Sequence, residues 1–118
     1  MPGQMEARTV SGSRTIIADA VRLGNVHPGD VLREDFLIGS EISVAEVVER
    51  AAIPIERMTD LLAGRVPVDA ETDLRLARYL GVSEGLFLRL QNAYDLEEAT
   101  RDHAAELARI QPRVYKAA

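Results

Sequence analysis

Helix-breaking residues recur at short intervals and limit how long a helix of this chain can be. They are Pro28, Gly39, Pro54, Gly64, Pro67, Gly81 and Pro112. Proline is tolerated only in the first turn of a helix, and glycine is favoured just beyond its end. Between these breaks, apolar residues recur three and four positions apart, as on the buried face of a helix. No segment alternates convincingly as a strand, so the chain predicts an all-α fold built from short helices.

The pattern predicts five short helices within residues 28–96 and a sixth that extends toward residue 110. Ser43, Asp69 and Ser83 stand where N-caps are expected, and Glu46 would complete a capping box with Ser43. Residues 15–23 have helical spacing but also fit a short edge strand. The last predicted helix has an apolar stripe that fits dimerisation or partner contact as well as burial within the chain: Leu96, Ala99, His103, Leu107 and Ile110.

Composition excludes several classes of protein. The chain has 118 residues, which fits one domain, and no cysteine, which rules out a disulfide scaffold or a thiolate metal site. No apolar run approaches the roughly 18–20 residues of a membrane span. The N-terminal residues lack the apolar core of a secretory signal. We therefore expect a cytoplasmic protein that has no membrane contact.

Signatures of catalysis are missing from the sequence. Two histidines, His27 and His103, lie far apart, and no metal-binding pair or glycine-rich phosphate loop is present. We expect His27 to belong to a helix-entry turn and His103 to be a packing or interface residue. Most carboxylates stand at helix starts or on solvated faces. The sequence therefore predicts no enzyme, no cofactor and no metal.

The segments 43–51 and 54–63 have the dimensions of a helix-turn-helix, two short helices joined by a tight turn. In such a unit the second helix enters the major groove of DNA, with its N-terminal residues at the base edges. The face expected to be exposed carries Ile55, Glu56, Arg57, Thr59 and Asp60. Simple packing of two neighbouring helices remains the alternative.

Five segments together resemble the HigA-type antitoxins. They are HPGDVL at 27–32, SVAE at 43–46, LLAGR at 61–65, LRLARYLG at 74–81 and FLRLQNAYDL at 87–96. The resemblance covers residues 27–97 and implies a five-helix bundle of the lambda-repressor kind there. Outside it, the residue pattern predicts a partly mobile tail over residues 1–26 and a helical extension and tail over residues 98–118. The resemblance also implies a homodimer that binds operator DNA to repress its own operon and neutralises a HigB-type, RelE-like toxin that cleaves mRNA.

The residues expected to contact DNA are Ser43, Ile55, Glu56, Arg57, Thr59, Asp60 and Arg65. Glu56 fits the amino group of cytosine, Ile55 a thymine methyl, and Arg57 guanine or phosphate. Three positions depart from the family pattern, which has a small Ala at Val48, Gly at Ala52 and a capping Ser at Pro54. Val48 and Ala52 suggest a shifted helix crossing, Ala52 is costly if its φ is positive, and Pro54 removes a cap and a backbone donor.

Charge leaves a second function open. The chain carries net −5, and residues 43–66 carry net −1, a weak footprint for DNA binding. Segment sums are acidic or neutral throughout, so we expect no hidden basic face, and such a surface suits a basic partner. The alternative is a helix-turn-helix-fold regulator or interaction module without a toxin and with weakened DNA binding.

Overall fold

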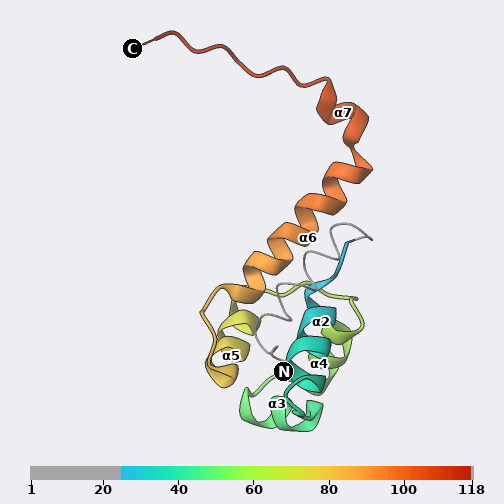
Figure 1. The fold of residues 1–118 in the computed structure, drawn as a ribbon, viewed down its shortest axis with the longest axis vertical. Coiled ribbons are helices and arrows are strands. Elements are labelled where there is room, and N and C mark those ends of the chain that lie inside the picture. The colour runs from blue at the N-terminus through green and yellow to red at the C-terminus, as the bar shows by residue number, and fades with distance from the viewer. Residues whose placement is uncertain (1–24, 118) are drawn as a thin grey trace.

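The structure is a computed structural model that describes residues 25–117, and the regular elements in that range are all helices, with no strand. The helices are α2 (Pro28–Val31), η1 (Leu32–Ile38), α3 (Val44–Arg50), α4 (Ile55–Leu62), α5 (Ala70–Leu80), α6 (Leu86–Asp102) and α7 (Ala104–Ala108). The helices up to the start of α6 form a packed body, from which α6 rises and continues into α7 (Figure 1). The all-α prediction is confirmed, whereas residues 15–23 lie outside the described residues.

One apolar core joins these helices. Each of η1, α3, α4, α5 and α6 contributes at least one fully buried side chain: Leu32, Val47, Met58, Leu61, Leu76 and Phe87. Phe87 meets Phe36 of η1 with ring centroids 5.6 Å apart. Because these side chains lie opposite the solvent-facing residues at helical spacing, the periodicity of the sequence located most of the core.

Apolar spacing predicts that Ile38 lies on the buried face of the helix after Pro28 and Leu74 on that of the helix after Asp69, and both predictions are wrong. Ile38 is 61% exposed, and Leu37 is buried in its place. The cause is that Leu32–Ile38 forms a π-helix, in which backbone bonds run to the fifth residue, as from the Gly39 N–H to the Glu34 oxygen. The wider turn shifts by one residue the side chain that faces the core. Leu74 is also exposed, whereas Asp73 beside it is buried.

Asp73 caps α6 from inside the protein. Its Oδ1 accepts the backbone N–H groups of Phe87 and Leu88 at 2.8 and 3.1 Å, and its Oδ2 accepts that of Gly85 at 2.6 Å. The sequence placed the cap at Ser83, but Gly85 occupies the N-cap position and no side chain from it caps the helix. The first turn of α6 would otherwise leave buried donors without partners, so a residue of α5 supplies the acceptor.

The boundary between the last two predicted helices also lies elsewhere in the structure. The residues around 95 continue one helix from Leu86 to Asp102, and the break falls at His103, where φ is −122° and ψ is 24°. Every residue from 99 to 117 is exposed, including Leu107 and Ile110. Of the helices within residues 25–117, none is both long enough and apolar enough to cross a membrane.

His27 caps α2 and contacts the segment that follows α4. Its Nδ1 accepts the Gly29 N–H at 3.0 Å, and its ring meets the edge of Tyr94 with centroids 5.0 Å apart. Burial lowers the pKa of His27 below its ordinary value, although Asp30 and Asp95 oppose the shift. This agrees with its expected place in a helix-entry turn, and it favours a neutral ring that can accept the N–H.

Replacing Asp73 by Ala should lower the free energy of unfolding by about 3 kcal/mol, because three backbone donors lose a charged acceptor. Urea denaturation followed by circular dichroism measures the loss. Ser43→Ala is the matched control, since it removes an exposed cap and should cost only about 1 kcal/mol. Equal losses in the two variants would contradict the role given to Asp73.

The stability of the fold should fall as the pH drops through the ordinary pKa of histidine. A histidine whose folded pKa is lowered binds protons more readily when unfolded, so its contribution is complete above about pH 6.5 and decreases below it. Melting temperatures between about pH 5.5 and pH 8 test this, with His27→Asn as a control that keeps an acceptor but does not titrate. An identical pH slope in the variant would contradict the prediction.

Candidate nucleic-acid interface

Helices α3 and α4 and the turn between them form the predicted helix-turn-helix. Ser43 caps α3, with its Oγ accepting the Glu46 N–H at 3.0 Å. The capping box is only half formed, because the Glu46 carboxylate accepts the phenol O–H of Tyr79 from α5. The buried Ile53 closes the turn, and its N–H donates to the Val48 oxygen at 3.2 Å.

Ala52 adopts a left-handed backbone conformation with φ of 56°. The sequence predicted a cost in stability if φ of Ala52 is positive, and it is positive. A Cβ is disfavoured in this conformation. Pro54 precedes α4 as its N-cap and supplies no side-chain hydrogen bond. Val48 packs against the core as a partly buried residue.

Replacing Ala52 by Gly should raise the free energy of unfolding by about 0.5–1 kcal/mol, because relief of the left-handed strain exceeds the added chain entropy. Thermal denaturation measures the gain. The control is Ala45→Gly on the exposed side of α3, which should lower stability by about 1 kcal/mol. A loss of stability in both variants would show that Ala52 is not strained.

Helix α4 is held against the body at its C-terminal end. A Cβ added to Gly29 would lie 2.0 Å from the Leu61 oxygen, so only glycine allows α2 to approach α4 so closely. From η1, Arg33 donates through Nη1 to the Leu62 oxygen at 2.9 Å, and it also pairs with Asp30 at 2.8 Å. These contacts fix the end of α4, while Met58 and Leu61 anchor its inner face.

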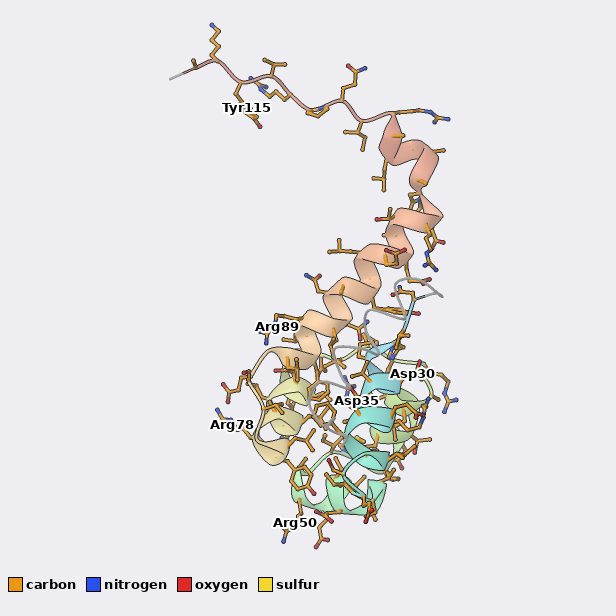
Figure 2. All side chains as sticks on the ribbon, viewed as in Figure 1. Asp30, Asp35, Arg50, Arg78, Arg89 and Tyr115 are labelled. Atoms are coloured by element: carbon orange, nitrogen blue, oxygen red, sulfur yellow. The ribbon has the colours of Figure 1, made fainter. Side chains whose placement is uncertain are left out.

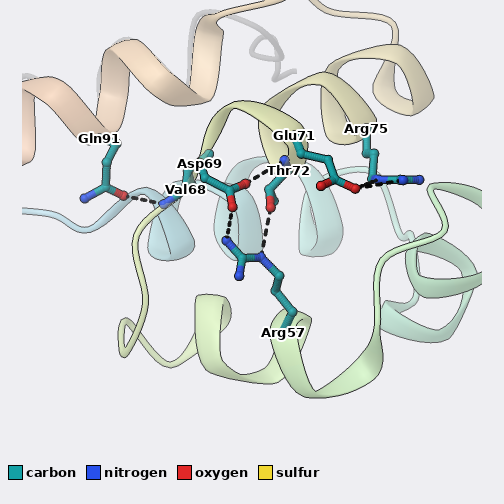
Figure 3. A network of polar contacts seen from close by, with 7 residues as sticks. All are labelled: Arg57, Val68, Asp69, Glu71, Thr72, Arg75 and Gln91. Carbon is teal, nitrogen blue, oxygen red and sulfur yellow. Dashed lines mark hydrogen bonds and ion pairs between the residues drawn. The ribbon is translucent and has the colours of Figure 1, made fainter.

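Arg57 is engaged inside the protein. Its Nε donates to Thr72 Oγ1 at 3.0 Å and its Nη2 to Asp69 Oδ2 at 2.7 Å, which ties α4 to the start of α5 (Figure 3). Hydrogen bonds from Thr72, and then the guanidinium of Arg57, hold the pKa of Asp69 below its ordinary value. These bonds hold the Nε and Nη2 atoms of the guanidinium against the start of α5, so we expect Arg57 to position α4.

The other predicted contact residues divide into two groups. Arg65 pairs with Asp60 at 2.9 Å, so each neutralises the other. Ile55, Glu56 and Thr59 are exposed, and Ile55 keeps 48% of its surface accessible. We call these three residues the exposed face of α4. No ion pair to Glu56 occurs among the described residues, so the face carries a single acidic charge.

A double-mutant cycle should detect the ion pair of Arg57. The side chains of Arg57 and Asp69 are 36% and 54% exposed, so we expect a coupling energy of about 0.5–1 kcal/mol between Arg57→Ala and Asp69→Ala. Urea denaturation of the four proteins measures it. Arg50→Ala is the control, because Arg50 makes no ion pair among the described residues and should couple to Asp69 by less than about 0.3 kcal/mol.

A basic surface that segment sums could not reveal lies beside α3. Arg50, Arg75, Arg78 and Tyr79 line an open hollow of about 550 Å³ between α3 and α5. Figure 2 shows Arg50, Arg78 and Arg89, from three different helices, along one side of the body. Two of the three arginines that line the hollow form ion pairs, Arg75 with Glu71 and Arg78 with Glu84. Basic side chains that are spread along the sequence therefore gather on one side of the folded protein, although nearby carboxylates pair with two of them.

Nothing in the described part of the chain resembles a metal centre, since no three His, Asp or Glu side chains cluster as ligands. The two histidines lie apart: His27 is buried beside Tyr94, whereas His103 is exposed and contacts Glu106 at 2.9 Å. The polar network around α5 caps helices and joins elements. Gln91, for example, accepts the Val68 N–H at 2.9 Å (Figure 3).

Comparison with known proteins supports this geometry. No protein-family model matches the chain. Virulence-associated protein I of Dichelobacter nodosus is 32% identical over 77 residues, which are 65% of this chain and 71% of the relative. An addiction module antidote protein of the HigA family from Coxiella burnetii is 31% identical, with a TM-score of 0.69 over 75% of this chain and 98% of that one.

The structure of antitoxin GraA in complex with its operator is 30% identical, with a TM-score of 0.71 over 79% of this chain and 95% of that one. These matches span the helix-turn-helix and nearly the whole length of both solved antitoxins. The chain therefore belongs to the HigA family of antitoxins, helix-turn-helix proteins that are not enzymes.

Proposed function

We propose that this protein is an antitoxin that binds operator DNA through α4 and represses its own operon. The observation that carries the proposal is the placement of the first turn of α4 on the surface, within a fold that GraA shares in complex with its operator. Ser43, at the start of α3, and the exposed face of α4 supply the DNA contacts. Arg57 positions α4 through its bonds to the start of α5.

The N-terminus of α4 offers a site for a phosphate of the DNA backbone. The first bond of the helix runs from the Met58 N–H to the Pro54 oxygen, so the preceding N–H groups lie outside the helical bonding pattern. Pro54 provides no side-chain acceptor for them. Unpaired N–H groups and the positive end of the helix dipole attract anions, which offsets part of the acidic charge of residues 43–66.

The antitoxin half of the proposal rests on family membership and on charge. A HigB-type toxin that cleaves mRNA must attract a polyanion, so a protein of net −5 complements it. Leu96, Leu107 and Ile110 are exposed on α6 and beyond, where they suit contacts in a homodimer or with the toxin. The protein needs no cofactor for either role.

A salt series with DNA from upstream of the protein's own gene tests repression. Affinity should fall steeply with salt, by about 0.9 in log–log slope for each phosphate neutralised. Thr59→Asp adds a charge on the exposed face of α4 and should weaken binding by about ten-fold or more, whereas Ser83→Asp adds it away from α4 and should not. Equal effects of the two changes would place DNA elsewhere.

Co-expression with the product of the adjacent gene tests the antitoxin role. A stable complex and restored growth are expected, and neither would be seen if this chain had no toxin partner. The second candidate function is an interaction module that has lost DNA binding, which Glu56 and the balanced arginines favour. Absence of any DNA retardation at low salt, with a complex still formed, would select it.

A further inference from the structure

The ion pairs around α4 leave an unusual set of groups for base recognition. Arg57 is bonded to Asp69 and Thr72. Arg65 and Asp60 neutralise each other. Of the charged residues in α4, only Glu56 has no ion pair among the described residues, and it lies in the first turn beside Ile55. The first turn is the part of a recognition helix that reaches the base edges.

A carboxylate accepts hydrogen bonds and donates none. In the major groove, cytosine presents its N4 amino donor, whereas guanine and thymine present acceptors that repel a carboxylate. Adenine offers an amino donor beside the N7 acceptor, which disfavours a carboxylate at the same edge. The chemistry of Glu56 therefore distinguishes cytosine from the other three bases.

We propose that Glu56 is the specificity-determining residue of α4 and reads a cytosine in each operator half-site. Ile55 then contacts the methyl group of a neighbouring thymine. This assignment rests on the proposed function, since it requires that α4 enter the major groove. It differs from recognition of guanine by arginine, because the arginine of this helix is bound to α5.

Bases other than cytosine also contribute to specificity, because they penalise binding of the Glu56 carboxylate. A carboxylate that enters the groove loses water, and opposite an acceptor it regains no hydrogen bond. It also approaches the phosphates, which lowers affinity for every sequence. Glu56 thus weakens binding to most sites and restores it where cytosine supplies a donor. The net charge of −1 over residues 43–66 accordingly reduces non-specific binding and favours specificity.

The test compares wild type, Glu56→Gln and Glu49→Gln on a set of operators in which every half-site position carries each of the four base pairs. Glu49 is an exposed carboxylate on α3, so its change removes the same charge outside α4. Wild type should prefer cytosine at one position by about ten-fold. Because glutamine pairs with the N6 and N7 of adenine, Glu56→Gln should transfer that preference to adenine, whereas Glu49→Gln should keep cytosine.

The outcomes separate this proposal from the function on which it depends. If wild type binds DNA but no position changes its preferred base in Glu56→Gln, the assignment of Glu56 is wrong and DNA binding stands. If none of the three proteins binds DNA at low salt, the proposed function fails and the assignment fails with it. Glu56 is not among the core residues, so we expect its substitution to leave the fold intact. Circular dichroism of each variant checks this.

Discussion

The buried carboxylate of Asp73 determines how the two halves of the structure meet. It belongs to α5 but accepts three backbone N–H groups at the start of α6, so it sets where α6 begins. Phe87, the second residue of α6, is thereby inserted into the core against Phe36. This acceptor fixes the start of α6, while Gln91 and Tyr94 hold the helix farther along through Val68 and His27. Figure 1 shows α6 leaving the body and continuing into α7.

Contacts from other elements also fix α4, the helix that we propose to contact DNA. Gly29, Arg33 and Arg57 all act on α4 from within the protein, so that an eight-residue helix, too short to be stable alone, is held in one position. The use of Arg57 for this purpose removes a cation from the surface. The exposed face of α4 then consists of Ile55, Glu56 and Thr59, and it carries no basic side chain.

Sequence patterns predicted the helix-turn-helix well because its signals are local. Ser43, Ala52, Pro54 and Gly64 act on neighbouring backbone groups. The structure confirms a cap at Ser43, and it shows a positive φ at Ala52, the condition on which a cost was expected there. Predictions were wrong where distant residues intervene. Asp73 of α5 replaced Ser83 as the cap of α6, a contact between helices that periodicity does not detect. A separate, local cause exchanged Ile38 for Leu37, because the π-helix departs from the 3.6-residue spacing on which the prediction rested.

The sequence by itself determined the helical class, the short lengths of the central helices and the location of the helix-turn-helix, because caps, breaks and apolar spacing act within a few residues. Tertiary structure alone decided which charged groups are free. Arg57 is identical in kind to any surface arginine in the sequence, yet packing places it beside Asp69 of a different element. Within residues 25–117 Glu56 has no such partner, because that ion pairing depends on distances between helices that no local pattern encodes.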